Sequence, residues 1–217
     1  MSVRLPVAAA VLLVLLVSAP ARAAERVVVA LGDSLTAGLG VTRDEAYPAL
    51  LEARLRQQGH DYRVVNAGVS GDTSAGGRRR VDWVLRAKPE CVIVALGAND
   101  GLRGLPVEEL RENLEAIVRQ LQAGGARVLL VGMRVPPNYG DEYARAFAAV
   151  FPTVARRTGV ALAPFLLDGV AGEARLNQPD GIHPTAEGQR VIAASLWPHL
   201  LRLLNVGPPR HSRGVPR

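Results

Sequence analysis

A serine, a histidine and an aspartate have the residue types that nucleophilic catalysis requires. Ser34 closely follows a short apolar run that has the character of a buried strand. A serine hydroxyl becomes a useful nucleophile when a neighbouring base, usually histidine, takes its proton and a carboxylate orients that base. His183 has an acid at short range, because Asp180 lies three residues before it. One loop can present both side chains on the same side, so that Asp180 accepts the His183 Nδ1–H and Nε2 faces the nucleophile.

Each of these residues also has a simpler interpretation. Ser34 can serve as the N-cap of a helix, and Asp180 can cap the helix that begins near Pro184. Ser70 is a rival nucleophile, although it lacks the strand-to-helix placement of Ser34. The spacing of Asp180 and His183 is therefore weak support for catalysis unless further groups accompany it.

Acyl transfer also requires hydrogen-bond donors aimed at the oxyanion that develops on the attacked carbonyl. Suitable donors are the backbone N–H groups of Ser34 and of Gly71, where no side chain blocks the approach, and the side-chain amide of Asn99. Gly71 and Asn99 are also ordinary turn residues. Because these residues follow successive predicted strands, their combination favours an oxyanion hole over unrelated turns.

The elements that must position these residues are short apolar runs that alternate with helical patterns. A run without a polar residue, such as Cys91–Leu96, is typical of a central parallel strand covered on both faces. The alternation predicts an α/β fold with right-handed βαβ crossovers and a parallel sheet of about five strands between helix layers. The predicted strands are Val27–Leu31, Tyr62–Val65, Cys91–Leu96, Val128–Met133 and Val160–Pro164.

The helical pattern is clearest in Pro106–Ala123, where apolar residues recur every three or four positions and two glycines follow. Pro106 suits the first helical position. A last helix is predicted to start near Thr185 and to kink or break at Pro198. The other predicted helices are Pro48–Gln58, Thr73–Ala87 and Tyr143–Thr158.

This fold class predicts where a ligand binds, because open α/β sheets bind ligands beyond the carboxyl ends of their strands. Ser34, Gly71 and Asn99 come shortly after the first three predicted strands. Asp180 and His183 come after the last one. We therefore expect all five residues to converge on one rim of the sheet.

Four short motifs carry a resemblance to a known family. They are Gly32-Asp33-Ser34-Leu35, Gly71 within Val-Ser-Gly-Asp-Thr-Ser, Gly97-Ala98-Asn99-Asp100, and Asp180-Gly-Ile-His183. In this order and spacing they resemble the four sequence blocks of the GDSL, or SGNH, hydrolases. The likeness is greatest to the periplasmic bacterial branch of thioesterases, lysophospholipases and arylesterases, and it extends over roughly residues 27–204. Ala98 departs from the pattern, since this branch often has glycine there.

The resemblance implies a serine acyl-hydrolase with a flavodoxin-like three-layer αβα fold and no cofactor or metal. Its substrates would be carboxylic esters or thioesters, cleaved through an acyl-Ser34 intermediate. By this likeness His183 is the general base, Asp180 orients it, and Ser34, Gly71 and Asn99 form the oxyanion hole. The resemblance also implies a mobile segment after Asn99 and a substrate groove. Residues expected to line the groove are Leu102, Val135, Pro136 and Tyr139.

Other functions stay open as alternatives. One is a carbohydrate O-acetyl esterase of the same family. Another is a flavodoxin-like module that binds a phosphate in the loop at residues 34–38, which would leave Asp180 and His183 without a role. A metal-dependent phosphoesterase could use a set of acids with a histidine, namely Asp33, Asp100, Asp180 and His183. No G-x-S-x-G elbow occurs, so the α/β-hydrolase fold is unsupported.

The N-terminal residues carry an export pattern. Arg4 precedes an apolar run that ends at Val17, Pro20 follows, and Ala21-Arg22-Ala23 fits a signal-peptidase site. The uncharged stretch is shorter than the roughly 20 residues of a spanning helix, so a cleaved signal is favoured over a retained anchor. We therefore expect a signal peptide at residues 1–23, a hydrolase domain at 24–207 and a basic disordered tail at 208–217. A periplasmic or secreted location follows from this division.

Composition narrows the partners of the 217-residue chain. The net charge is +6, with arginine clusters at Arg78-Arg79-Arg80 and in the C-terminal tail. Aromatic residues make up 4% of the chain and do not interleave with these clusters, as a nucleic-acid groove would require. We interpret the clusters as solvated basic surface.

The single cysteine, Cys91, lies in an apolar run and is expected in the core. We expect a small acyl substrate, no nucleic-acid partner, no stable membrane insertion after signal removal, and a monomeric state.

Overall fold

The computed structural model describes residues 25–205 of the chain. These residues form a five-stranded sheet in which every strand pair is parallel. The strands are β1 (Arg26–Gly32), β2 (Tyr62–Gly68), β3 (Cys91–Ala95), β4 (Arg127–Val131) and β5 (Ala161–Ala163). Each overlaps a predicted strand, and the predicted fold class is confirmed.

The strand order β2-β1-β3-β4-β5 places β1 between β2 and β3. The chain therefore leaves β1 for one edge of the sheet and returns past it to start β3. Gly32 at the end of β1 lies opposite both Gly68 of β2 and Ala95 of β3. The carboxyl ends of these three strands are thus level, and the loops that follow them meet at one rim. Ligands of open α/β sheets bind at such a switch point.

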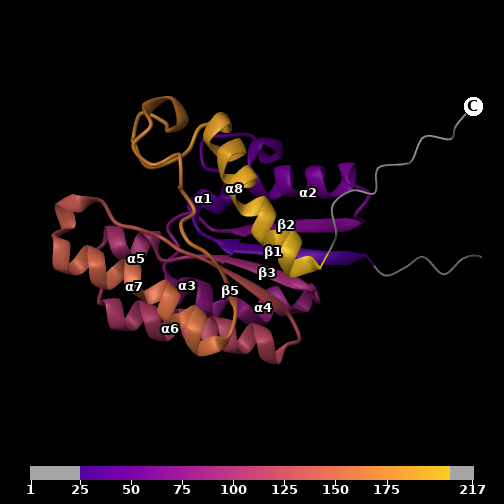
Figure 1. Ribbon diagram of the computed structural model, residues 1–217, viewed down its shortest axis with the longest axis horizontal. Coiled ribbons are helices and arrows are strands. Elements are labelled where there is room, and N and C mark those ends of the chain that lie inside the picture. Colours follow the sequence, from indigo (N-terminus) through magenta and orange to yellow (C-terminus); the bar gives the residue numbers. More distant parts are fainter. Residues whose placement is uncertain (1–24, 206–217) are drawn as a thin grey trace, which may run out of the picture.

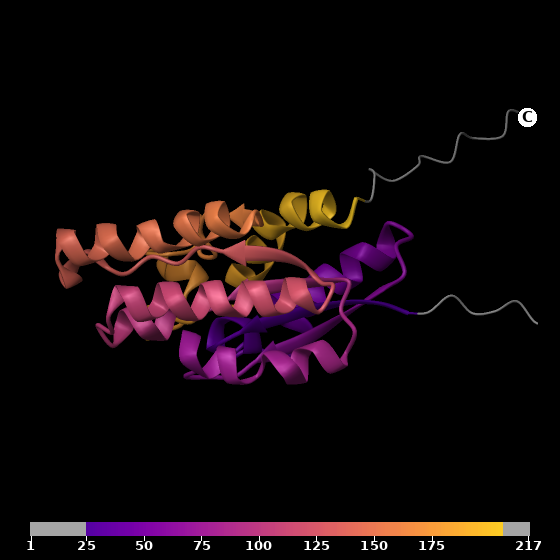
Figure 2. The same ribbon diagram turned by 90° about the horizontal axis from the view of Figure 1, so that it is seen from below.

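Helices cover both faces of the sheet (Figure 1). On one face α2 (Tyr47–Gln57) and α8 (Ala186–Leu204) pack on each other and on the strands. The helices of the other face are shown side by side in Figure 2, in purple, pink and orange. They are α3 (Ser74–Arg79), α4 (Val81–Arg86), α6 (Val107–Ala123) and α7 (Asp141–Thr158).

Short helices occupy the loops at the strand ends. The α-helical ones are α1 (Ser34–Ala37), directly after β1, and α5 (Ala98–Leu102), shortly after β3. The 3-10 helices are η1 (Arg43–Glu45), η2 (Pro137–Tyr139) and η3 (Ala174–Leu176). Pro106 is the N-cap of α6 rather than its first helical residue. This differs by one position from the predicted start.

The segment predicted as one helix over Thr73–Ala87 forms two helices instead, α3 and α4. They are separated by Arg80, whose ψ of 0° departs from the helical value. The Arg80 side chain bonds to carbonyl groups at the ends of β1 and β2. The break therefore lies at the residue that turns inward to the sheet.

Helix α8 runs without interruption through Pro198, so a break there is wrong and a kink stays a prediction. A proline inside a helix removes one backbone hydrogen bond and crowds the preceding turn. Leu196 and Trp197 before it and Leu200 after it are all buried. Their packing offsets the lost bond and holds both halves of the helix in place.

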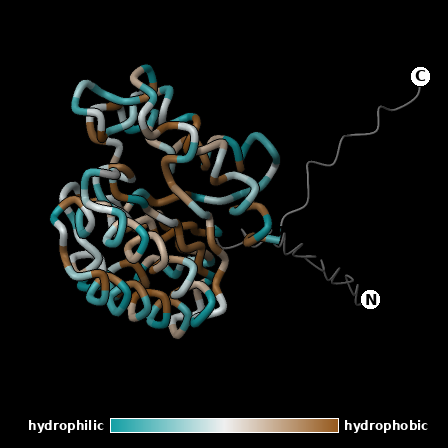
Figure 3. The backbone as a smooth tube through the Cα atoms, turned by 60° about the vertical axis from the view of Figure 1, so that its left-hand side comes forward, coloured by the Kyte–Doolittle hydropathy of each residue, from teal (hydrophilic) through white to brown (hydrophobic). Residues whose placement is uncertain are grey.

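Apolar side chains of the strands and of the inner helix faces form one continuous core. In Figure 3 the hydrophobic stretches gather in the interior, and the hydrophilic ones follow the outer loops. Every residue of β3 is fully buried, as predicted for a central strand. Cys91 begins this strand, and burial raises the pKa of its thiol to about 12. Cys91 is therefore a core residue and not a reactive thiol.

Among the helices at residues 25–205, none is both long enough and apolar enough to cross a membrane. The predicted signal peptide at residues 1–23 and the predicted basic tail at 208–217 lie outside the described residues.

Candidate active site

Ser34 lies where β1 ends and α1 begins. Asp33 is the N-cap of α1, because its Oδ1 accepts the Leu35 backbone N–H at 3.0 Å. The helix does not use the Ser34 hydroxyl as its cap, so this hydroxyl is available to another partner. Gly32 lets α1 fold back on the strand, since a Cβ at this position would lie 2.0 Å from Thr36 Oγ1.

His183 and Asp180 reach Ser34 from a loop far along the chain. The His183 Nε2 lies 3.0 Å from Ser34 Oγ, and its Nδ1 lies 2.7 Å from Asp180 Oδ2. An ionised carboxylate can only accept hydrogen bonds, so this contact favours the tautomer with its proton on Nδ1. Nε2 is then an acceptor for the Ser34 hydroxyl. The three residues form one continuous hydrogen-bonded chain.

Asp180 also shapes the loop that carries His183. Its Oδ1 accepts the backbone N–H of His183 at 3.0 Å and of Ile182 at 2.9 Å. The bonds from the His183 backbone and ring, together with that from Ile182, lower the pKa of Asp180 to about 2. The carboxylate is thus ionised throughout the neutral range. The cap of α8 is Thr185, whose side chain accepts the Gly188 N–H, and not Asp180.

Gly71 presents a backbone N–H in the loop after β2. Its φ of 82° lies in the left-handed region, which glycine adopts without strain. The Arg103 guanidinium donates to its carbonyl at 2.9 Å and so fixes the peptide. Within residues 25–205, neither the Gly71 N–H nor the Ser34 N–H donates a hydrogen bond to another residue. Both groups are therefore available to a ligand.

Asn99 lies in the first turn of α5 and bridges two of the loops. Its Nδ2 lies 2.9 Å from the Asp72 carbonyl oxygen and 3.4 Å from Asp33 Oδ2. Asp72 directly follows Gly71, so the first contact joins the loop after β2 to the loop after β3. The second contact joins Asn99 to the residue that precedes Ser34. The amide nitrogen thus lies among the residues that were predicted to form the oxyanion hole.

Arg80 is a site residue that the sequence did not reveal, and its interpretation as solvated surface is wrong. Its guanidinium forms an ion pair with the Asp72 carboxylate at 2.6 Å. It also donates to the Ala67 carbonyl at 3.0 Å and to the Gly32 carbonyl at 3.2 Å. Arg80 therefore ties the ends of β1 and β2 to the loop that carries Gly71. The two arginines before it are exposed, and no local pattern separates it from them.

Two glutamines attach the His183 loop and α8 to the segment around Ser34. Gln178 donates to the Leu39 carbonyl at 2.7 Å and to the Pro184 carbonyl at 3.0 Å. Gln189 is fully buried, accepts the Tyr47 N–H at 2.9 Å and donates to the Leu35 carbonyl at 3.2 Å. In the sequence, the one sign that Gln189 has a structural role is that this polar residue stands among the apolar positions of α8.

Two of the four residues expected in the substrate groove are bonded to each other. The Tyr139 hydroxyl donates to the Leu102 carbonyl at 2.8 Å, which attaches η2 to the end of α5. The neighbouring Tyr143 hydroxyl donates to the Leu105 carbonyl, also at 2.8 Å. The segment after Asn99, which the resemblance implies to be mobile, is thus held at two carbonyls by tyrosines of the segment at residues 137–158.

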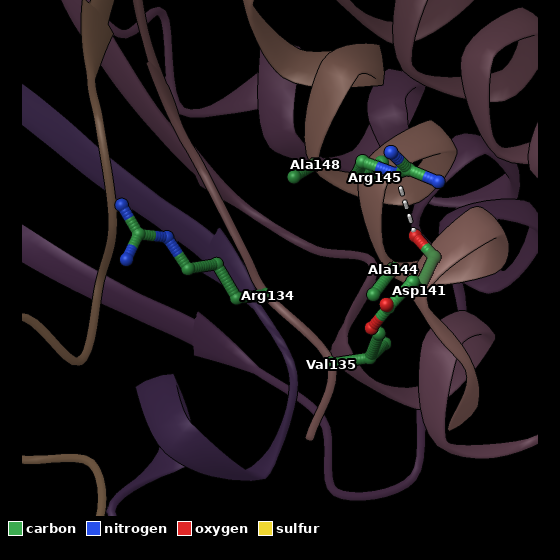
Figure 4. A pocket seen from close by; sticks show the side chains of 6 residues that line it. All are labelled: Arg134, Val135, Asp141, Ala144, Arg145 and Ala148. Carbon is green, nitrogen blue, oxygen red and sulfur yellow. Dashed lines mark hydrogen bonds between the residues drawn. The ribbon is translucent and has the colours of Figure 1, made fainter. Parts of the chain in front are cut away.

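Val135 lines a surface pocket of about 370 Å³ (Figure 4). Its other lining residues are Arg134 and four residues of α7, namely Asp141, Ala144, Arg145 and Ala148. In Figure 4 the Arg134 side chain points away from α7, and the Arg145 side chain donates to the Asp141 carbonyl. Pro136 is exposed. Neither Ser34 nor His183 lines this pocket, so it lies outside the hydrogen-bonded chain of the candidate site.

The acids proposed for the phosphoesterase alternative have other partners. Asp100 accepts the Ser74 backbone N–H at 2.8 Å and its hydroxyl at 2.5 Å. Asp33 caps α1, and Asp180 contacts His183. Across the part of the chain that the structure describes, no three His, Cys, Asp or Glu side chains are grouped to hold a metal ion.

Comparison with known sequences and structures gives a consistent result. The sequence model of the GDSL-like Lipase/Acylhydrolase family matches residues 30–191. Esterase TesA of Pseudomonas aeruginosa is 45% identical over 184 residues, which cover 84% of this chain and 92% of that protein. Thioesterase 1/protease 1/lysophospholipase L1 of Escherichia coli is 39% identical over 176 residues, covering 81% of this chain and 83% of that protein.

A solved structure supports the same assignment. The psychrotrophic esterase EstA from Pseudoalteromonas sp., in a crystal structure inhibited by monoethylphosphonate, is 35% identical to this chain. The two folds superpose with a TM-score of 0.79, over 83% of this chain and 99% of that one. The sequence motifs, the sheet order and the overall backbone therefore point to one family.

Proposed function

The chain belongs to the GDSL-like lipase/acylhydrolase family, and we propose that it hydrolyses carboxylic esters or thioesters through an acyl-enzyme formed on Ser34. The observation that carries this proposal is the hydrogen-bonded chain from Ser34 through His183 to Asp180, at 3.0 and 2.7 Å. Both distances lie in the range that a nucleophile, a base and an orienting acid require.

In the first half of the reaction, His183 Nε2 takes the Ser34 proton as Oγ attacks the carbonyl carbon of the substrate. The carbonyl π electrons move to the oxygen, which becomes an oxyanion. The imidazolium then gives its proton to the leaving alcohol or thiol as the bond to the acyl carbon breaks. In the second half, water replaces the alcohol or thiol, His183 again takes and returns one proton, and the carboxylic acid leaves Ser34 free.

The oxyanion would be stabilised by the backbone N–H groups of Ser34 and Gly71 and by the Asn99 amide. Support comes from the two N–H groups, which have no partner among the described residues, and from the position of Asn99 between the loops of the other two donors. Donors that are fixed before the reaction stabilise developing charge without reorganisation. Arg103 and Arg80 contribute by holding the Gly71 loop and the strand ends.

An apolar acyl group suits the surface around these residues. Four large apolar side chains are prominently exposed in residues 25–205, and three of them belong to loops of the candidate site. Leu39 follows α1, Val69 follows β2, and Ile182 lies next to His183. Exposed apolar side chains gathered around a reaction centre favour an apolar ligand. We expect the acyl chain to contact some of these residues, and we expect Leu102, Val135, Pro136 and Tyr139 to line the substrate groove.

We also propose that the protein is exported and acts in the periplasm or outside the cell as a monomer, after cleavage following Ala23. The support is the sequence pattern of residues 1–23. The hydrolase domain would then span residues 24–207, followed by the basic tail. The mass of the protein recovered from the periplasmic or secreted fraction, and its elution volume on a sizing column, test these statements.

The function is tested by hydrolysis of p-nitrophenyl esters and of an acyl thioester. Ser34→Ala should lower kcat by at least about 10³-fold, because the nucleophile is lost while binding is preserved. Ser70→Ala is the matched control, since it removes another hydroxyl from the same rim and should leave kcat unchanged. Equal activity of Ser34→Ala and the native protein would contradict the proposal, as would loss of activity in Ser70→Ala alone.

A further inference from the structure

Asp33 is a buried acid that forms no ion pair within residues 25–205, although the charge of the nearby His183 favours its ionised form. Its side chain has no solvent exposure. No Lys, Arg or His nitrogen of residues 25–205 lies within ion-pair distance of it. Burying a carboxylate in this way is unfavourable, and burial raises the pKa of Asp33 to about 6. An Asn or Ser could cap α1 equally well without this cost. Capping alone therefore does not explain an acid here.

The second carboxylate oxygen has a different partner from the first. Oδ1 accepts the Leu35 N–H at 3.0 Å, whereas Oδ2 faces Asn99 Nδ2 at 3.4 Å. The same Nδ2 lies 2.9 Å from the Asp72 carbonyl oxygen. Neither a carboxylate nor a carbonyl can donate a hydrogen bond, so both repel the oxygen of the Asn99 amide. The two acceptors together allow one orientation of the amide.

We propose that Asp33 is a positioning residue for Asn99. With the Asp72 carbonyl, its carboxylate turns the amide nitrogen rather than the amide oxygen toward the carbonyl group of the substrate. This inference rests on the proposed function, because it concerns the oxyanion donor of that reaction. At 3.4 Å the Asp33 contact is long and weak. The Asn99 N–H that faces Asp33 is therefore oriented by the carboxylate and can still donate a hydrogen bond to an oxyanion.

The proposal explains why an acid directly precedes Ser34. Through Leu35 the carboxylate starts the helix that carries Ser34, and through Asn99 it orients a donor on the neighbouring strand end. One buried group thus sets the relative placement of the nucleophile and an oxyanion donor. Preorganisation of this kind affects the transition state more than substrate binding.

The variant that tests the proposal is Asp33→Asn. Its Oδ1 must still accept the Leu35 N–H, which forces its NH2 group to face the NH2 group of Asn99. Two donors then oppose each other, and the Asn99 amide loses its fixed orientation. We expect kcat for a p-nitrophenyl ester to fall by about tenfold or more with KM little changed. Asp82→Asn, at an exposed position of α4, removes the same charge and should leave kcat unchanged.

A double-mutant cycle with Asn99→Ala shows whether Asp33 acts through Asn99. If it does, Asp33→Asn has no further effect on kcat once the Asn99 amide is absent. A native kcat in Asp33→Asn, or an equal loss in both backgrounds, overturns the proposal. If Asp33→Asn does not fold, Asp33→Ser carries the same test, because it keeps a cap and loses the acceptor for Asn99. Lack of activity in both the native protein and Asp82→Asn would instead count against the proposed function.

Discussion

At the residue scale, the candidate site uses both side chains and backbone N–H groups. Ser34, His183 and Asp180 form the chain that moves a proton, and the ionised Asp180 favours the tautomer that this chain needs. The backbone N–H groups of Ser34 and Gly71 need no side chain at all. The sequence therefore has to provide a glycine at residue 71 and a helix start at residue 34.

Asn99 is the side-chain member of the predicted oxyanion hole, and its removal should affect the chemical step. We expect Asn99→Ala to lower kcat by roughly 10²–10³-fold, with KM changed much less, because one donor to the oxyanion is lost. Steady-state kinetics with one ester at saturating and sub-saturating concentrations separate the two constants. An unchanged kcat would show that Asn99 is only a turn residue.

At the element scale, the sheet order brings the functional loops together. The level ends of β1, β2 and β3 place the loops of Ser34, Gly71 and Asn99 at one rim. Runs rich in apolar residues predicted every end of these three strands to within three residues, because buried strand positions favour apolar side chains. The division of α3 from α4 was not predictable, since it depends on contacts of Arg80 with distant carbonyl groups.

Arg80 should matter more than the adjacent arginine. Arg80→Lys keeps the charge, but one ammonium group cannot reproduce the fork that reaches Asp72, Ala67 and Gly32. We expect a Tm lower by about 4 °C and a kcat lower by about tenfold, because the strand ends lose a common anchor. Arg79→Lys is the control and should change neither. Calorimetry and ester kinetics that show the same result for both variants would contradict this role.

At the scale of the whole molecule, contacts between distant segments reveal supporting residues that sequence motifs do not identify. The motifs identified Ser34, Gly71, Asn99, Asp180 and His183 because each uses a residue type with specific chemistry. Supporting contacts use residue types that are common on surfaces, so composition does not mark them. The residues of this kind are Arg80, Arg103, Gln178 and Gln189. They become apparent when the fold places their partners beside them.

The buried charge of Asp33 should make the stability of the whole molecule depend on pH. Because its pKa is raised from 3.8 to about 6 in the folded protein, the folded state binds more protons than the unfolded state between these values. The contribution of Asp33 to stability therefore falls as pH rises through this window. The Tm of Asp33→Asn minus the Tm of the native protein should therefore be about 5 °C more positive at pH 8 than at pH 4.5. A difference in Tm that does not vary with pH would contradict an ionised, buried Asp33.

The most direct test of the proposed mechanism is covalent labelling of the nucleophile. A fluorophosphonate reacts with a serine that a neighbouring base activates, and digestion followed by mass spectrometry identifies the labelled residue. The proposed mechanism predicts one adduct, on Ser34, and no labelling of Ser34→Ala under the same conditions. A native protein that is not labelled, or an adduct on Ser70 or any other residue in place of Ser34, would contradict it.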